Sequence, residues 1–434
     1  MLVRLFGKNF RSLRDRFELS MVAADLKRDD DRGRGTIEVA ITGMEEPLQL
    51  LRVAAIYGPN ASGKSTLLTA GRALRWIVKS SSHQAKPGSA IPPYEPFKLD
   101  ASAQDAPIEL GCDVVHGKKV LRYEISYTQH EIQTERLSLL SDSGSQVLID
   151  RQQLGAIAGT LITKSKANQL YVKGMQPNVA VLSKLAQHGP QKGKDSAQPY
   201  FRSINIATQY ADYSDAAESS SFFGDERFAT DDEYREWIMQ HLMRTADVGI
   251  CGVQTRQEAF SIPDTAKEQL TKLGGEFQIP ESRVLIEFVH KGNSNQPIDF
   301  AHESSGTKKL FNIAGDWWKL SKEHCTLFAD ELSASLHPRL LDRLVRAVNS
   351  PALSNIRSQL IFTTHDIGLL EGQDGEPPAL RRDQVFFTSK ATDGASELYS
   401  LAEFKEDARP VHNIRKRYMS GIYGAIPSVE RLSL

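Results

Sequence analysis

The chain alternates short apolar runs with polar stretches, and the clearest run begins at Val53. The segment Val53–Tyr57 is continuously apolar and stops at Gly58-Pro59-Asn60, which predicts a buried strand that enters a loop. A helix is expected next, because apolar side chains recur on one helical face at Leu67, Leu68, Ala70, Leu74 and Ile77. Residues 80–96 are rich in Ser, Pro and Gly, which predicts little regular structure there.

The remaining N-terminal pattern predicts antiparallel strands. A short strand is expected at Leu2–Phe6, followed by apolar residues separated by charges, as in an edge sheet. The segments Ile108–Val115 and Val120–Tyr127 are separated by a turn at Gly117-Lys118, which predicts a hairpin. This part of the chain should therefore be rich in β structure.

The last third alternates strand and helix patterns, which predicts a mostly parallel sheet flanked by helices. The expected elements are the strand 325–329, the helix 338–348 and the strands 359–364 and 384–388. The middle of the chain, with helix-like patches between polar stretches, should be an insertion. We therefore predict an α/β fold, a mixed sheet with helices and an antiparallel edge sheet, divided into residues 1–147, a partly helical inserted subdomain 148–282, and residues 283–434.

Composition narrows the class of protein. The 434 residues carry 53 basic and 54 acidic side chains, a globular composition with a net charge of -1, and no run is apolar enough to cross a membrane. We expect a cytoplasmic protein without membrane partners, whose three scattered cysteines have no special role. Any nucleic-acid contact must come from a local patch. Five lysines of the middle form no helical stripe, so the sequence leaves nucleic-acid binding open: Lys164, Lys166, Lys184, Lys192 and Lys194.

The loop after the first buried strand carries a phosphate-binding motif. It fits G-x-x-x-x-G-K-[ST], with a strand before it and a helix after it, as the motif requires. Lys64 is expected to reach the β- and γ-phosphates of a nucleotide, and Ser65 to hold Mg²⁺. The predicted nucleotide-binding residues are Gly58, Pro59, Asn60, Ala61, Ser62, Gly63, Lys64, Ser65 and Thr66.

Two later strand ends supply the remaining catalytic groups. Asp330 and Glu331 follow the apolar run 325–329, so Asp330 is expected in the magnesium shell and Glu331 as the general base that polarises water. His365 follows the next strand of the series and is expected at the same edge of the sheet, against the γ-phosphate and the attacking water. The catalytic set is therefore predicted as Lys64, Glu331 and His365.

A second anion site is predicted ahead of these carboxylates. Ser304-Ser305-Gly306-Thr307 opens an amphipathic helix, and helix N-termini with serine hydroxyls bind anions. One chain cannot easily direct both anion sites at one phosphate. We therefore expect a dimer in which Ser305 and Gly306 of one protomer cap the nucleotide that Lys64 of the other protomer holds.

Taken in order, these motifs resemble the Walker A, signature, Walker B, D-loop and H-loop of an ABC-type ATPase. The segment Leu332–Pro338 resembles the D-loop and the Leu-His-Pro sequence that follows it. They are most similar to the SMC/RecF/OLD branch. Three further segments resemble stand-alone bacterial ATPases of the abortive-infection AbiLi/RloA type: Asn9-Phe10-Arg11-Ser12, Pro96-Phe97-Lys98-Leu99 and Arg417–Pro427. The signature of these ATPases reads Leu-Ser-Gly-Gly-Gln, and the corresponding segment here differs from it, so the resemblance is best supported for its central serine and glycine. No glutamine that corresponds to the Q-loop of the family stands out in this sequence.

The resemblance implies an ATP-hydrolysing subunit of an anti-phage defence system. It implies Mg²⁺ as cofactor, a homodimer or higher homo-oligomer, and a separately encoded nuclease or toxin effector, since no nuclease motif follows His365. It also implies that Ser304, Ser305 and Gly306 act in trans and that Ser333 and Ala334 form the D-loop contact. Two alternatives stay open: a RecF-like DNA repair or recombination ATPase, and a slow nucleotide-gated assembly scaffold.

Overall fold

The fold is described from a computed structural model of the chain. The description covers residues 1–26, 34–141, 144–152, 156–204, 206, 209–212, 228, 230–244, 249–259, 282–292, 296–334, 336–353, 356–373, 375–404 and 413–427. Within these residues the chain separates into two compact units, residues 1–211 with 320–333 and 341–434, and residues 212–319 with 334–340. Each unit is described by itself.

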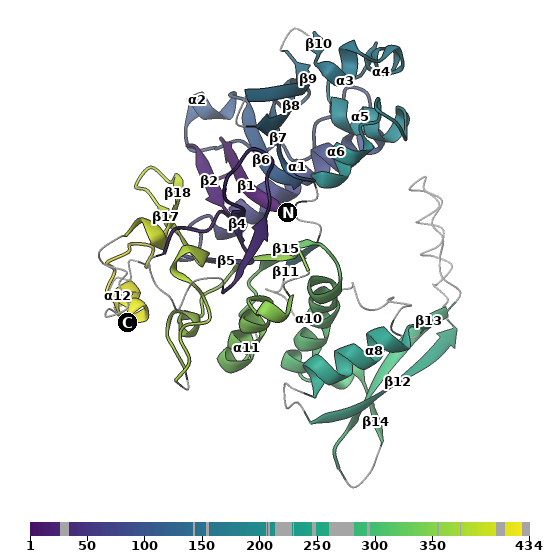
Figure 1. The fold of residues 1–434 in the computed structure, drawn as a ribbon. Helices are drawn as coiled ribbons and strands as arrows, with labels where there is room; N and C mark the ends of the chain where they lie inside the picture. The colour runs from purple at the N-terminus through teal and green to yellow at the C-terminus, as the bar shows by residue number, and fades with distance from the viewer. Residues whose placement is uncertain are drawn as a thin grey trace. The chain divides into compact units, whose positions relative to one another are not determined.

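The first unit contains a mostly parallel sheet, which confirms the predicted α/β class (Figure 1). Its strand order is β11-β15-β16-β5-β17-β18, in which β15, β16, β5 and β17 run parallel and β18 is antiparallel to β17. The strands are β5 (Val53–Tyr57), β11 (Gln209–Asp212), β15 (Thr326–Asp330), β16 (Gln359–Thr363), β17 (Val385–Lys390) and β18 (Ser396–Ser400). Every side chain of β5, β15 and β16 is buried, which explains why these strands are continuous apolar runs.

The same unit contains an antiparallel sheet in the order β10-β9-β8-β7-β6-β1-β2, as the N-terminal pattern predicts. The predicted hairpin pairs Ile108 with Tyr127 and His116 with Lys119. The strands are β1 (Leu2–Lys8), β2 (Phe17–Ser20), β6 (Ile108–His116), β7 (Lys119–Tyr127), β8 (Ile132–Ser141), β9 (Gly144–Arg151) and β10 (Ile157–Ala158), and a separate pair is formed by β3 (Thr36–Val39) and β4 (Leu48–Leu51).

Helix α1 (Lys64–Gln84) joins these two sheets. It contacts β15 and β16 of the parallel sheet and β6 of the antiparallel sheet, and its apolar face, including Leu67 and Leu74, is buried in the core. The other helices of the first unit are α2 (Ala101–Gln104), α3 (Thr160–Thr163), α4 (Lys166–Val172), α5 (Val181–His188), α6 (Gln198–Ser203) and α12 (Ile414–Met419), with α11 (Pro338–Val348) beginning at the boundary between the units.

The N-terminus of α5 is fixed to the antiparallel sheet by a buried carboxylate. Glu135 of β8 accepts hydrogen bonds from the backbone N–H of Val181 and Leu182, at 2.6 and 2.9 Å, and from the hydroxyl of Tyr123 at 3.0 Å. A carboxylate at this position satisfies donors that the first turn of α5 leaves unpaired. Burial raises the pKa of Glu135, and the two backbone donors oppose that shift.

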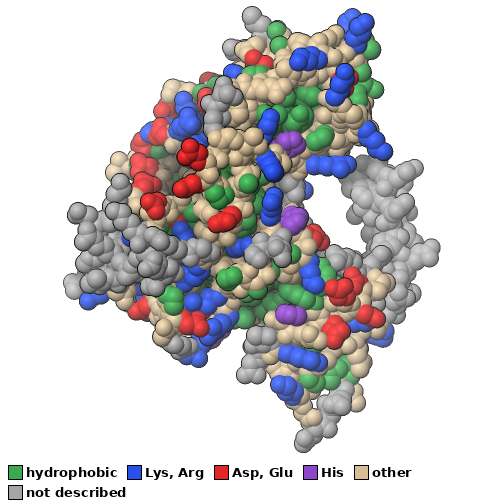
Figure 2. Space-filling view, viewed as in Figure 1, with side chains coloured by type: hydrophobic (Ala, Val, Ile, Leu, Met, Phe, Trp, Pro, Cys, Tyr) green, Lys and Arg blue, Asp and Glu red, His purple; other side chains and the backbone are tan. Residues whose placement is uncertain are grey.

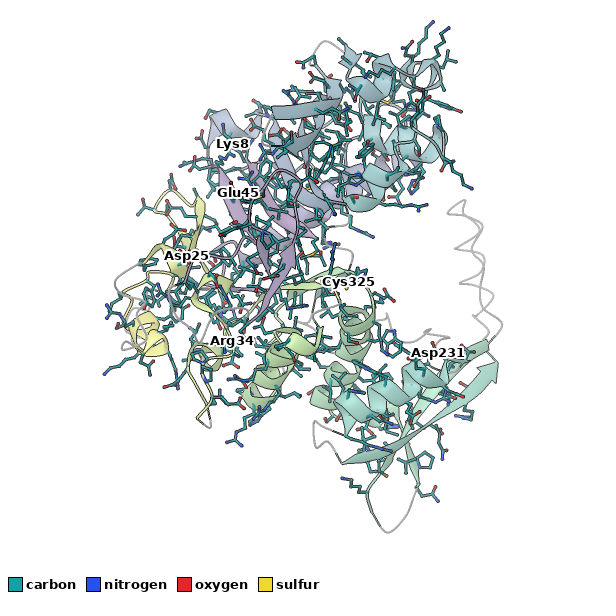
Figure 3. The ribbon with its side chains drawn as sticks, in the orientation of Figure 1. Lys8, Asp25, Arg34, Glu45, Asp231 and Cys325 are labelled. Carbon is teal, nitrogen blue, oxygen red and sulfur yellow. The ribbon has the colours of Figure 1, made fainter. Side chains whose placement is uncertain are left out.

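The second unit has an antiparallel sheet in the order β12-β13-β14, with an aromatic core. Its elements are α8 (Asp232–Ile238), a π-helical turn Met239–Met243, β12 (Ile250–Ala259), β13 (Ser282–His290), β14 (Pro297–Asp299), the 3-10 turn Phe300–His302 and α10 (Ser305–Lys322), which ends across the boundary between the units. Asp231, labelled in Figure 3, begins α8 by accepting a hydrogen bond from the N–H of Tyr234 at 3.0 Å. The ring of Trp318 meets those of Tyr234 and Trp237 edge to face.

The predicted domain division differs from these units. Residues 156–204 of the predicted insertion 148–282 lie in the first unit, because α5 packs on α1 and is capped from β8. The pairing of β12 with β13 was not predicted either, and residues 260–281, which lie between these strands in the chain, are outside the described residues. A polar strand that pairs at this distance carries little local signal, so the partly helical prediction for this region omitted its sheet.

Two expectations from composition can be compared with the described residues. None of the helices there has both the length and the hydrophobicity needed to cross a lipid bilayer. Cys112 and Cys325 are buried and Cys251 is half-buried, all three as free thiols. Cys325 lies immediately before β15 (Figure 3), where it behaves as a small core residue.

Candidate functional site: a phosphate-binding loop with strand-end carboxylates

The phosphate-binding loop lies between β5 and α1, as the motif predicts. Gly63 has φ of +105°, and a Cβ added there would lie 2.6 Å from Ser396 Oγ. Gly58 is equally confined, since its Cβ would lie 2.4 Å from Thr388 Oγ1. Both positions therefore require glycine because a side chain there would collide with β17 or β18. The turn also needs the backbone conformational freedom that glycine provides.

Lys64 is the first residue of α1 and is only 5% exposed. Its Nζ donates hydrogen bonds to the carbonyl oxygens of Gly58 and Pro59 at 3.0 and 3.1 Å, so the ammonium group is held inside the loop. Burial lowers the pKa of Lys64, while the charges of Glu331 and then Asp330 oppose the shift. The fold thus brings Lys64 close to both predicted carboxylates, which are more than 250 residues away in sequence.

Thr388 of β17 is a site residue that the sequence analysis missed. Its hydroxyl is fully buried and forms a 2.6 Å hydrogen bond with the hydroxyl of Ser62 in the loop. Thr388 Oγ1 also donates to the carbonyl oxygen of Tyr57 at 3.3 Å, so Ser62 is the donor to Thr388. A threonine inside a strand is a weak signal in sequence, and Thr388 becomes recognisable as a site residue only because β17 pairs with the loop strand β5.

We expect Thr388→Val to weaken ATP binding by about three- to tenfold, because Ser62 would keep a buried hydroxyl without its partner. Isothermal titration with ATP, together with steady-state hydrolysis, measures the effect. The turnover number should change little, since Glu331 and His365 are untouched. Thr388→Ser keeps the hydroxyl and should restore wild-type affinity. Equal affinities for the Val variant and the wild type would contradict this role for Thr388.

The predicted carboxylates lie at the end of β15 and are tied to β16 by one threonine. Thr363 donates through Oγ1 to Asp330 Oδ1 at 2.6 Å and accepts from the backbone N–H of Glu331 at 2.8 Å. Glu331 adopts φ of +49°, an uncommon conformation for a residue other than glycine, which turns the chain sharply after the strand. Thr363, fully buried, was also absent from the sequence prediction.

The side chains of His365 and Glu331 are brought into contact. His365 Nε2 lies 3.3 Å from Glu331 Oε1, and both side chains are accessible, at 43% and 24%. The backbone N–H of His365 also donates to Ser333 Oγ at 3.4 Å, which links the predicted D-loop to the histidine. The predicted catalytic pair is therefore adjacent in space and open to a substrate.

Ser65 and Asp330 carry oxygen donors of the kind that a magnesium ion prefers. Ser65 is exposed at the start of α1, and Asp330 supplies a carboxylate in the same unit. Mg²⁺ prefers oxygen ligands and is commonly held by one or two carboxylates together with phosphates and water. Among the described residues, no group of three or more His, Cys, Asp and Glu side chains is placed to hold a metal by itself. A nucleotide phosphate would therefore have to complete this shell.

The predicted signature residues begin α10 of the second unit. Ser304 caps the helix, since its Oγ accepts from the N–H of Thr307 at 3.1 Å and lies 2.8 Å from the hydroxyl of Thr307. The preceding Glu303 is held by His290 Nε2 of β13 at 2.6 Å, a contact that the sequence analysis did not foresee. Ser305 and Gly306 thus lie in a helical first turn that is anchored to the sheet of this unit.

The three other quoted segments contact the residues on either side of the phosphate-binding loop or contact one another. Ser12 Oγ donates to Thr66 Oγ1 at 3.3 Å, and Asn9 holds the second segment by accepting from the N–H of Phe97 at 3.1 Å. In the C-terminal segment, the ring of Tyr418 packs edge to face on Tyr57, the residue before the loop, with 6.0 Å between centroids. Segments from both ends of the chain therefore meet at the loop strand.

These features define a P-loop nucleotide-binding domain with strand-end carboxylates and a histidine, the arrangement of an ATPase. Residues 189–371 match the family described as "AAA domain, putative AbiEii toxin, Type IV TA system". The match includes Asp330, Glu331 and His365, and the loop 58–65 precedes it. It agrees with the resemblance to abortive-infection ATPases that the motifs show.

Several solved structures are similar to the chain at low identity. The SMC head domain from Thermotoga maritima is 13% identical, with 92% of this chain and 98% of that chain covered and a TM-score of 0.38. A Smc head bound to the C-winged helix domain of ScpA is 13% identical, with 93% and 99% covered and a TM-score of 0.42. A Smc head with an extended coiled coil, bound to the C-terminal domain of ScpA derived from Pyrococcus furiosus, is 12% identical, with 97% and 99% covered and a TM-score of 0.37.

Because all three TM-scores are below 0.5, these structures are not used to assign a role to any residue of the chain. No curated protein matches the chain.

Proposed function

We propose that the chain is the ATP-binding and ATP-hydrolysing subunit of a bacterial anti-phage defence system of the abortive-infection type. In this proposal it dimerises head-to-head around ATP and controls a separate nuclease or toxin effector. The observation that carries the ATPase assignment is the convergence of Lys64, Asp330 and the Glu331–His365 pair at one edge of the parallel sheet. The family match over residues 189–371 supports the defence context.

The proposed chemistry is positioning and charge stabilisation around the γ-phosphate. Lys64 would bind the β- and γ-phosphate oxygens, and Glu331 would accept the proton of the attacking water. His365, 3.3 Å from Glu331, would orient that carboxylate and contact the γ-phosphate. Ser65 and Asp330 would hold Mg²⁺, which when bound neutralises phosphate charge. Thr363 fixes Asp330 and the turn at Glu331 through two short hydrogen bonds.

A second copy of the chain would complete the site. Ser304, Ser305 and Gly306 of the partner would cap the γ-phosphate, and Ser333 and Ala334 would form the D-loop contact between protomers. A helix N-terminus offers free N–H groups and a favourable dipole to an anion. Because the side chain of Ser304 already caps this helix internally, Ser304 would meet the phosphate through its backbone N–H group, beside Ser305 and Gly306.

The defence assignment is tested by isolating the complex from the native host. Tagged Glu331→Gln protein, purified with ATP and Mg²⁺ from infected and uninfected cells, should bring a nuclease or toxin subunit with it, identified by mass spectrometry. The same preparation from Lys64→Ala cells serves as the control without nucleotide. Recovery of DNA repair proteins in place of such an effector would contradict the defence assignment and support the RecF-like alternative.

A further inference from the structure

The segment that contains α3 to α6 carries a strong local excess of positive charge. Within residues 156–204, called here the basic module, Asp195 is the single carboxylate, although the whole chain has a net charge of -1. The module has seven basic side chains: Lys164, Lys166, Lys173, Lys184, Lys192, Lys194 and Arg202. A local charge of +6 in a nearly neutral chain indicates that this surface binds an anionic partner.

The cations of the basic module are accessible. All are exposed except Lys184, which is half-buried, and none of the seven forms an ion pair with a residue that the structure describes. Asp195 accepts a hydrogen bond from Ser165 Oγ at 3.1 Å. Figure 2 shows Lys and Arg side chains gathered over the part of the molecule where Figure 1 labels α3, α4 and α5. The charges are therefore presented to solvent together.

The module is firmly attached to the helix that follows the phosphate-binding loop. Gln187 Nε2 donates to the carbonyl oxygen of Lys79 at 2.7 Å, and Ser183 Oγ accepts from the N–H of Ser82 at 3.2 Å. Lys79 donates to the carbonyl oxygen of Phe201, and burial lowers its pKa to about 8. The helices that carry and connect the exposed cations are thus fixed to α1.

We propose that the basic module binds the phosphodiester backbone of nucleic acid. Closely spaced lysines that neutralise phosphates supply sequence-independent affinity through release of counterions. Tyr171, 41% exposed on α4, adds a ring on which a base can stack. An anionic membrane suits the module less, because α4 and α5 have only seven and eight residues, whereas surface-lying helices bury a long apolar face. The inference does not depend on ATP hydrolysis.

The test compares two triple variants of the full-length chain. Lys164, Lys166 and Lys173 are changed to Gln in one, and Lys98, Lys390 and Lys416, which are exposed outside the module, in the other. Anisotropy of a fluorescein-labelled 30-base-pair DNA and of single-stranded RNA of equal length gives the Kd at several salt concentrations. The module variant should bind more weakly, with a slope of log Kd against log salt that is less steep by about 2 to 3.

The control variant, which loses the same charge, should keep the wild-type slope, and melting curves of both variants should overlay that of the wild type. An equal loss in both triple variants would overturn the proposal, since net charge and not the module would then govern binding. Absence of DNA and RNA binding by the wild type would also overturn it. So would lysine-dependent binding to phosphatidylserine vesicles without nucleic-acid binding, which would assign the surface to a membrane.

Discussion

The Glu331→Gln protein is expected to bind ATP with nearly unchanged affinity and to hydrolyse it at least about 100-fold more slowly. Glutamine keeps the size of the side chain and the backbone hydrogen bond from Glu331 N–H to Thr363, but it cannot accept a proton from water. In the proposed cycle the ATP-bound dimer separates only after hydrolysis, so the variant should accumulate as a dimer. Phosphate release and light scattering in the presence of ATP and Mg²⁺ measure the two effects.

A matched control is available just before the same strand. Glu323 is exposed just before β15 begins, at the opposite end of the strand from Glu331. Glu323→Gln should hydrolyse ATP at the wild-type rate and dissociate normally after turnover. Wild-type turnover by the Glu331→Gln protein would remove Glu331 from the role of base. A monomeric Glu331→Gln protein that nevertheless holds ATP would refute the head-to-head dimer.

The Lys64→Ala protein is expected to lose ATP binding by on the order of 100-fold or more. In the proposed function Lys64 would donate charge-assisted hydrogen bonds to two phosphates, each worth about 1.5–3 kcal/mol, and a tenfold change in affinity corresponds to about 1.4 kcal/mol. Its Nζ already lies inside the loop, where it bonds the carbonyl oxygens of Gly58 and Pro59, so no other cation is needed to explain phosphate binding there. Equilibrium dialysis with labelled ATP gives the affinity directly.

Because Lys64 is buried, its loss could also disturb the loop, and a thermal melt checks that the variant stays folded. Lys8 is exposed at the end of β1 and provides the matched control, since Lys8→Ala removes the same charge away from the loop. ATP affinity should be unchanged in that control. Nearly normal ATP affinity in a folded Lys64→Ala protein would show that the loop 58–65 does not bind the nucleotide.

The sequence by itself determined the α/β class, the phosphate-binding loop and the strand-end residues Asp330, Glu331 and His365. These features are local: a buried strand is a continuous apolar run, a phosphate loop needs glycines at fixed spacing, and strand-end residues follow directly in sequence. The carboxyl ends of parallel strands lie at the same edge of a sheet. The order of the strands along the chain therefore already indicated that Glu331 and His365 lie close together.

Only the tertiary structure decided which residues support that site and how the middle of the chain is divided. Thr363 and Thr388 are ordinary strand threonines until β15, β16, β5 and β17 pair and bring them against Asp330 and Ser62. The lysines of the basic module form no helical stripe, because most of them lie in the turns that connect short helices, and these helices are brought together by packing on α1 and on one another. Contacts between residues far apart in the chain depend on strand order and helix packing, and neither is encoded in a local pattern of apolar and polar positions.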